Sequence, residues 1–203
     1  PEDIRSDLRV RPSLAAFFGP LLDIDPAANP KVWLQEGYGR IFSASETDVE
    51  RALEGMAKEL AELEELTIPD KRFLAALEHY PGDRGALSAY FLNALHLNPG
   101  QAVFTGAGVP HSYLNGTIVE CMANSDNVVR AGLTPKFIDQ DVLLRMLTYE
   151  SAPPPVLKGE KQAGGTRLYT VPADEFQVEF LDGDQGQQRG YSAGSAVSLM
   201  LVL

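Results

Sequence analysis

The hydrophobic pattern of this chain changes abruptly at Asn98-Pro99-Gly100, and this change constrains the fold more than any other feature. Before the turn, apolar residues recur at spacings of three and four, which is the period of an amphipathic helix. After it, the apolar segments are short and extended, and Gly-rich turns separate them, as in an antiparallel sandwich or barrel. The sequence therefore predicts an α+β fold in which a helical domain over residues 1–97 precedes a β region.

Capping signals and apolar spacing locate the helices. The clearest helix is predicted to follow Ser45-Glu46-Thr47-Asp48, which contains a Ser-x-x-Asp capping signal, and to end before Pro69. Its buried face would carry Val49, Leu53, Met56, Leu60 and Leu63. A second helix is predicted with Asp70 as its cap and a third from about Asp83 to Leu95, with His79 and His96 near helix ends. Residues 13–18 and 31–40 are weaker candidates, because Pro and Gly interrupt them.

The β region divides into three predicted parts. Residues 98–150 would form a first portion with a short helix capped by Asp139. The Pro-rich and Gly-rich stretch 151–165 is predicted to be a linker, and 166–203 a further β domain. The predicted strands are 101–105, 109–114, 117–123, 127–131, 166–171, 175–181 and 191–203. Because the chain begins without Met and stops within an apolar run, we expect both ends, including the last β domain, to be truncated.

Charge and composition exclude several classes of function. The chain has 17 Lys+Arg against 28 Asp+Glu and a formal net charge of -11, and it has no long basic cluster. Binding to nucleic acid or to an anionic membrane surface is therefore not expected. No apolar run approaches the roughly 20 residues of a membrane helix, and no signal peptide is recognisable. The single Cys121, expected to be an inert core thiol, fits a reducing compartment, so we expect a cytoplasmic protein.

One cluster of residues could carry chemistry. The two-residue period of a strand would place His111 and Tyr113 on one face, and Glu120 would share a face with Ile118 and Met122 on the next strand. If that face is the interior, Glu120 is an ionisable group that needs a partner or a metal. Arg130 follows, with a guanidinium able to bind oxyanions. The spacing alone indicates this site only weakly, and no nucleotide-binding or serine-hydrolase motif is present.

Longer segments around this cluster have a distinctive amino-acid sequence. Pro110-His111-Ser112-Tyr113-Leu114, Val119-Glu120-Cys121-Met122-Ala123 and the run from Ser125 to Lys136 closely resemble the type I mannose-6-phosphate isomerase family. The resemblance implies a cupin jelly roll with a zinc site, a helical domain inserted in it and a second β domain. It also implies that His111 is a zinc ligand and that the remaining site residues line a sugar-phosphate pocket. These residues are Tyr113, Glu120, Asp126, Arg130 and Lys136.

The sequence also departs from the family pattern. The family's other metal ligands, a Gln-x-His pair and a Glu that follows a Lys, come from an N-terminal section for which this sequence offers no substitute. The chain therefore resembles the middle and later portion of a longer enzyme, and the rest of its own chain would be its partner in forming the site.

The resemblance implies interconversion of mannose 6-phosphate and fructose 6-phosphate through an enediol. Zinc would polarise substrate oxygens, and Glu120 is the candidate for proton transfer. Arg130 would stabilise the enediolate or orient Glu120, while Lys136 would hold the phosphate. Two alternatives stay open: a non-catalytic cupin sugar-binding module, and a cupin dioxygenase. The dioxygenase is disfavoured because its site usually draws a His-x-His pair from one strand, whereas this chain has His-x-Tyr.

Overall fold

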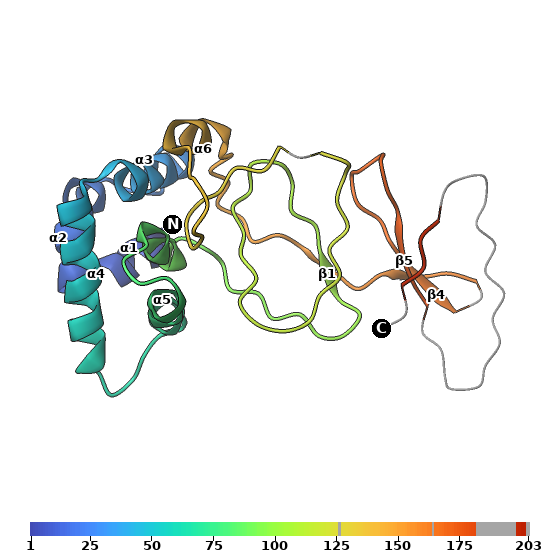
Figure 1. Cartoon of the computed structure of the whole chain (residues 1–203), viewed down its shortest axis with the longest axis horizontal. Helices are drawn as coiled ribbons and strands as arrows, with labels where there is room; N and C mark the ends of the chain where they lie inside the picture. The colour runs from blue at the N-terminus through green and yellow to red at the C-terminus, as the bar shows by residue number, and fades with distance from the viewer. Residues whose placement is uncertain (126, 164, 182–197, 202–203) are drawn as a thin grey trace.

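The computed structural model describes residues 1–125, 127–163, 165–181 and 198–201. Helices gather at one end of the molecule, and the strands β4 and β5 lie at the other, with extended chain between them (Figure 1). The helices are α1 (Glu2–Arg9), α2 (Pro12–Phe18), η1 (Gly19–Asp23), α3 (Pro30–Ser43), α4 (Glu46–Ala61), α5 (Ile68–His79), η2 (Arg84–Tyr90) and α6 (Gln140–Met146). The strands are β1 (Ala102–Val103), β2 (Val156–Leu157), β3 (Glu160–Lys161), β4 (Thr166–Tyr169) and β5 (Val178–Leu181).

The predicted capping at Ser45 is confirmed, and that at Asp70 is corrected. The Ser45 hydroxyl accepts a hydrogen bond from the Asp48 backbone at 3.1 Å and caps α4, whose end at Ala61 leaves Leu63 outside the helix. Helix α5 is instead capped by Thr67, and Asp70 is its third residue. The helix begins earlier than predicted because a Pro in the first turn of a helix costs no hydrogen bond. Thr67 and Asp70 form a reciprocal capping box.

The predicted third helix is a tight 3₁₀ helix, η2. Asp83 caps it, since the Asp83 carboxylate accepts a hydrogen bond from the Gly85 backbone at 2.7 Å. It ends at Tyr90, so Leu95 lies outside it and His96 is in exposed extended chain, not near a helix end as predicted. All its residues except Ala89 are buried. The α-helix was predicted from an apolar pattern that assumes one buried face, and packing on several sides overrides that pattern.

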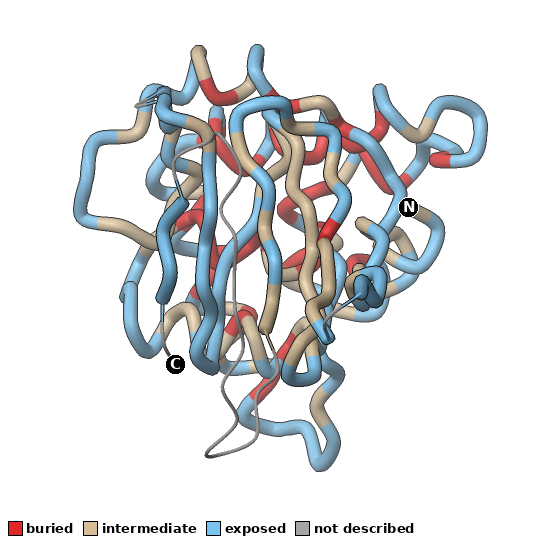
Figure 2. Tube along the Cα trace, turned by 90° about the vertical axis from the view of Figure 1, so that its right-hand side faces the viewer, coloured by how far each residue is buried: buried red, intermediate tan, exposed pale blue. Residues whose placement is uncertain are grey.

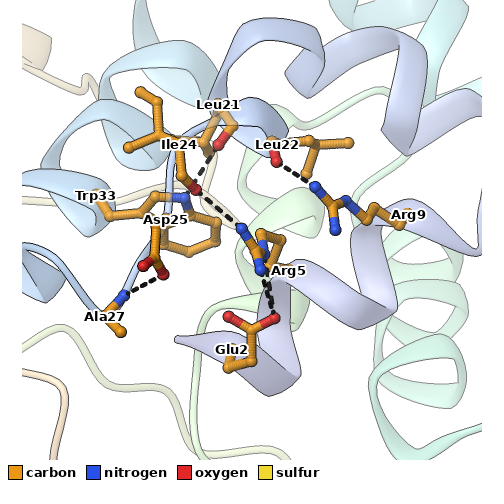
Figure 3. A network of polar contacts seen from close by, with 9 residues as sticks. All are labelled: Glu2, Arg5, Arg9, Leu21, Leu22, Ile24, Asp25, Ala27 and Trp33. Atoms are coloured by element: carbon orange, nitrogen blue, oxygen red, sulfur yellow. Dashed lines mark hydrogen bonds and ion pairs between the residues drawn. The ribbon is translucent and has the colours of Figure 1, made fainter.

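The N-terminal helix α1 is held by polar contacts that Figure 3 shows at close range. The Arg9 guanidinium donates to the Leu22 carbonyl at 2.6 Å, and Arg5 donates to the Ile24 carbonyl at 3.3 Å. The Trp33 indole donates to the Leu21 carbonyl at 3.1 Å. These bonds satisfy carbonyls at and just after η1, which links α1, η1 and α3.

Helix α3 runs unbroken through two glycines. The weaker prediction for residues 31–40 is therefore exceeded, since α3 spans 14 residues. A Cβ at Gly37 would collide with the Phe91 ring, whereas one at Gly39 would meet nothing within 4 Å. Gly37 thus permits close packing of Phe91 on the helix, and this contact compensates the low helix propensity of glycine.

The hydrophobic core lies almost entirely in the helical part. Trp33, Phe18, Phe42 and Phe73 are among its largest fully buried side chains. Helix α6, whose predicted cap at Asp139 is confirmed, packs on α3 and adds three buried residues at or just after it. These are Leu143, Leu147 and Tyr149. The C-terminal helix of the described chain therefore closes the same core.

The strands form two small antiparallel sheets. Strand β1 pairs with β2, and β3, β4 and β5 form a three-stranded meander in that order. The strands predicted within 166–171 and 175–181 are confirmed as β4 and β5. Two short strands, β2 and β3, occur within 151–165, where the sequence predicts a linker. The predicted loop 182–186 and most of the predicted strand 191–203 lie outside the described residues.

The extended chain between β1 and α6 carries little regular structure. Of the strands predicted there, 101–105 contains β1, while 109–114, 117–123 and the described part of 127–131 have no assigned strand. Most residues of this stretch are exposed or intermediate. Figure 2, which views the molecule from the end that carries β4 and β5, shows extended segments running side by side with mostly exposed and intermediate residues. Helices and small antiparallel sheets are thus established, and the jelly roll stays a prediction. Among the described helices, none has the length and apolar character needed to cross a bilayer.

Candidate functional site

His111 lies in an extended segment that is anchored at its start. The Gly108 carbonyl accepts a hydrogen bond from the Thr148 backbone at 3.0 Å, which ties the segment to the chain after α6. The Nδ1 atom of His111 lies 2.9 Å from the Val109 carbonyl oxygen. When Nδ1 carries the proton and donates it there, Nε2 keeps its lone pair. This is the tautomer in which an imidazole can bind a metal ion through Nε2.

Tyr113 and Glu120 form a direct pair across the Asn115-Gly116 turn. The Tyr113 hydroxyl donates to Oε1 of Glu120 at 2.8 Å, and the His111 and Tyr113 ring centroids are 5.7 Å apart. Partial burial and then the hydrogen bond and charge of Glu120 raise the pKa of Tyr113 to about 12. The phenol therefore stays protonated at neutral pH and acts as a donor, which orients the Glu120 carboxylate.

Sequence reasoning named both residues but missed their pairing. Tyr113 and Glu120 are equally distant from the centre of the turn between them, at positions 116 and 117. Residues in such mirror positions face each other across a hairpin. A two-residue turn at Asn115-Gly116 would instead place Ile118 opposite Tyr113, so the turn signal alone does not predict this hydrogen bond.

Arg130 and Lys136 lie on the following loop and do not join the pair. Both are exposed, and neither side chain makes a hydrogen bond or ion pair with another described residue. The Lys136 backbone donates to the Thr134 hydroxyl at 3.2 Å, so local bonds shape the loop. Asp126, the remaining predicted site residue, lies outside the described residues. Within the described chain, the structure thus brings together His111, Tyr113 and Glu120.

The predicted interior face is exposed in this structure. Tyr113 is 56% exposed, Met122 is equally exposed, and Glu120 and Arg130 are also exposed. Cys121, expected in the core, is an exposed free thiol. Strand-like alternation places side chains on two faces, but it buries one only where a second layer covers it. These side chains are exposed in the described chain, so the expectation of burial is wrong for them.

The described residues do not complete a metal site. No three His, Cys, Asp or Glu side chains within the described ranges come close enough together to hold an ion. His79 ends α5 and His96 lies in exposed chain, so neither joins His111 in a common cluster. His111 accordingly fits zinc as one ligand of a set, and an imidazole with a free Nε2 is a suitable donor for it.

Comparison with known proteins identifies the relatives of the chain. No family model matches it. Mannose-6-phosphate isomerase 2 of Arabidopsis thaliana is 39% identical over 169 residues, which cover 82% of this chain and 38% of the plant protein. The chain is related to the mannose-6-phosphate isomerases. A probable mannose-6-phosphate isomerase of Dictyostelium discoideum is 50% identical over 115 residues, or 55% of this chain and 25% of that protein.

The structural comparison agrees with the sequence comparison. A zinc-bound crystal structure of a mannose 6-phosphate isomerase matches with a TM-score of 0.73 and 32% identity. The match covers 88% of this chain and 44% of the crystallised one. The resemblance to the type I mannose-6-phosphate isomerases is thereby confirmed. The chain spans less than half the length of the relatives it matches.

Proposed function

We propose that this chain carries part of the active site of a zinc-dependent isomerase that interconverts mannose 6-phosphate and fructose 6-phosphate through an enediol. The observation that supports this most strongly is the zinc-bound isomerase structure, which matches 88% of the chain at a TM-score of 0.73. The identity of 39% to a mannose-6-phosphate isomerase over 82% of the chain supports the same activity. The substrate would then be a sugar phosphate.

His111 is the proposed zinc ligand. Its Nδ1 atom lies 2.9 Å from the Val109 carbonyl, and a hydrogen bond there fixes the tautomer that leaves Nε2 available. Zinc, when bound, would supply Lewis-acid polarisation of substrate oxygens without redox chemistry. The other ligands would come from residues of a longer protein, because no group of three ligating side chains forms among the described residues.

Glu120 is the proposed acceptor and donor of the proton that moves between C1 and C2 of the open-chain sugar. Its carboxylate is held by the 2.8 Å hydrogen bond from Tyr113, so one oxygen is oriented and the other is available. Tyr113 contributes by positioning this carboxylate and by offering an aromatic wall to the sugar.

The cationic residues would bind the negatively charged groups of the substrate. Arg130 is proposed to stabilise the enediolate oxygen, since a guanidinium can form two parallel hydrogen bonds with planar oxyanions. Lys136 is proposed to hold the phosphate, and Asp126 to bind a sugar hydroxyl. Arg130 makes no ion pair with a described residue that would compete with these roles.

The exposure of the site also fits the proposal. Tyr113 and its neighbours are exposed here, and the chain spans less than half the length of its relatives. We infer that the remainder of a longer protein covers this face and excludes water from it. We also propose that the whole protein is cytoplasmic, which fractionation of the source cells would test.

The proposed site is tested by the change His111→Ala in the full-length protein. We expect zinc content and turnover of mannose 6-phosphate to fall together, because removing a ligand opens the coordination shell. His79→Ala is the matched control, since His79 is an exposed histidine at the end of α5 and should leave both quantities unchanged. Full zinc content and normal turnover in His111→Ala would overturn the assignment.

The same measurements separate the alternatives. A full-length protein that binds mannose 6-phosphate but does not convert it would be the non-catalytic sugar-binding module. Iron content with oxygen consumption would indicate the cupin dioxygenase. Zinc content with isomerisation supports the function proposed here.

A further inference from the structure

We infer that a backbone contact between Gly85 and Gly132 positions the loop that carries Arg130 and Lys136, so that the helical part of the chain sets the geometry of the site. This inference rests on the proposed function, because it assumes that the two cations contact the substrate. Gly85 and Gly132 would be positioning residues, since neither has a side chain to reach a substrate.

The contact is too close for any residue but glycine on either side. A Cβ at Gly132 would lie 2.6 Å from the Gly85 Cα, and a Cβ at Gly85 would lie 2.8 Å from the Gly132 Cα. The Leu133 backbone nitrogen would lie 3.1 Å from the Gly85 Cβ. Both Cα distances fall below the separation that Cβ atoms tolerate, so the two backbones touch directly.

The helical side of this contact is firmly fixed. The Asp83 carboxylate accepts the Gly85 N–H at 2.7 Å, and η2 is buried around it. The neighbouring Arg84 guanidinium donates to the carbonyls of Ile41, Phe42 and Ala44 at 3.2, 3.0 and 3.1 Å, and it pairs with Glu46. Arg84 thus ties η2 to the end of α3, and Gly85 has little freedom to move.

The loop side is shaped to fit against it. Gly132 has a φ of +100° and Leu133 a φ of +52°, and the second value is unusual for a leucine. Val129, Ala131 and Leu133 are partly buried against the core. Arg130, which alternates with them, is exposed. The apolar residues therefore hold the loop to the helical part, while Arg130 points away from the core.

Both cations lie close to Gly132 along the chain, so the contact can determine their positions. Arg130 is two residues before Gly132, and Lys136 is four residues after it. A displacement of Gly132 would therefore be passed to both cations through short stretches of backbone. A shift of about 1 Å in a substrate-contacting group can cost roughly a hundredfold in rate.

The decisive variant is Gly85→Ala in the full-length protein. Gly85 is outside the left-handed region of φ, so alanine does not strain its own backbone. Its methyl group meets the Gly132 Cα at 2.8 Å and the flexible Asp83 carboxylate at 2.9 Å, so the Gly132 backbone must move. We expect kcat per zinc-loaded, folded molecule to fall about tenfold to a hundredfold. Zinc content should stay full, because His111 is not on this loop. In the 203-residue chain with the same change, cleavage by trypsin after the exposed Arg130 should accelerate, because the loop is then held less firmly.

Gly39→Ala is the matched control. A Cβ there meets nothing within 4 Å, so turnover, zinc content and the rate of cleavage after Arg130 should all equal those of the unchanged protein. If Gly85→Ala does not fold, Asp83→Ala removes the acceptor of the Gly85 N–H and should loosen the contact with a smaller loss, about threefold to tenfold in kcat.

The outcomes separate this inference from the proposed function. Normal kcat with unchanged cleavage after Arg130 in a folded Gly85→Ala protein would overturn the inference, and so would a kcat loss explained fully by lost zinc. Faster cleavage after Arg130 in a protein whose unchanged form has no isomerase activity would support the contact but refute the function. A lower kcat with faster cleavage after Arg130 and full zinc supports both.

Discussion

The helical part of the chain and the extended part differ in how fully they bury their apolar side chains. Between α1 and η2, large apolar residues such as Trp33 and Ile41 are fully buried, and the buried Asp70 and Arg84 are hydrogen bonded. Between β1 and α6, residues such as Tyr113 and Ile118 are more than half exposed. The helical part therefore buries most of its large apolar side chains in a core, whereas the extended part leaves apolar area exposed on its surface.

Because of this difference, the stability of the chain and its proposed chemistry depend on different parts of it. The helical part contains the buried charges whose loss would unfold it, while the predicted site residues lie on the extended part. The two meet where α6 packs on α3 and where Gly132 contacts Gly85. Away from these contacts, changes in the helical part should therefore affect folding first, and changes in the extended part should affect activity first.

The largest effect on stability is expected from Asp70→Ala. Asp70 is 0% exposed and accepts hydrogen bonds from Arg11 at 2.5 and 3.2 Å and from the Tyr90 hydroxyl at 2.7 Å. Its removal leaves a guanidinium and a phenol without their partner, which should cost about 3–5 kcal/mol of unfolding free energy by urea denaturation. Glu54→Ala, which breaks only the exposed pair with Lys58, should cost under about 0.5 kcal/mol.

The same carboxylate predicts acid sensitivity. Burial alone would raise the pKa of Asp70, but hydrogen bonds from Arg11, Tyr90 and Thr67 outweigh it and lower the pKa to about 2. Because the folded-state pKa lies below the ordinary 3.8, the stabilisation is complete above about pH 5 and is lost as the pH falls toward 2. Asp70→Asn should flatten the loss of stability in this range, and an unchanged pH profile would contradict the account.

Arg130→Lys should have the largest effect on activity. In the full-length protein we expect turnover to fall roughly a hundredfold to a thousandfold, because an ammonium cannot reproduce the bidentate contact of a guanidinium. Zinc content and melting temperature should be unchanged, since Arg130 is exposed and makes no ion pair with a described residue. A lower melting temperature with normal turnover per folded molecule would instead show a structural role.

A pair of glycines in α3 gives a smaller and sharper test of core packing. Gly37→Ala places a methyl group against the Phe91 ring and should destabilise the chain by about 1–3 kcal/mol. Gly39→Ala, two residues away in open space, should be neutral or stabilise it by up to about 1 kcal/mol. Thermal unfolding of both variants measures the difference, and equal melting temperatures would show that Phe91 is free to move.

The smallest effect is expected from Ile118→Ala in this 203-residue chain. Ile118 is about half exposed, and its truncation should cost less than about 0.5 kcal/mol. Ile41→Ala removes the same atoms from a fully buried position and should cost about 2–5 kcal/mol. If urea denaturation gave similar values for the two, the proposed contrast between the two parts of the chain would be wrong.

Sequence reasoning predicted the helical part well, because local signals determine it. Ser45 and Asp139 cap helices as expected, since a side chain that caps a helix acts within three residues. It misplaced the start of α5 and the type of η2, because Pro69 is tolerated in a first turn and η2 is shaped by burial on several sides. These outcomes depend on packing that a local pattern does not contain.

The sequence named the candidate site residues, whose roles stay a prediction, but it did not give their environment. The period of two placed His111 beside Tyr113, and their rings are neighbours in the structure. The hydrogen bond from Tyr113 to Glu120 was not predicted, because a two-residue turn at Asn115-Gly116 would place Ile118 opposite Tyr113. Burial of that face was predicted and is not observed, because burial depends on a covering layer and not on the strand itself. The Gly85–Gly132 contact joins residues 47 positions apart in the sequence, and no local signal indicates it.

Amide hydrogen exchange of the 203-residue chain tests the contrast between its two parts most directly. None of the backbone N–H groups from 111 to 124 donates a hydrogen bond to another described residue, whereas those of α3 and α4 lie in regular helices over a buried core. The account predicts that amides in α3 and α4 exchange only through global unfolding, and that amides from 111 to 124 exchange at nearly unprotected rates. Equal protection of both segments would contradict it.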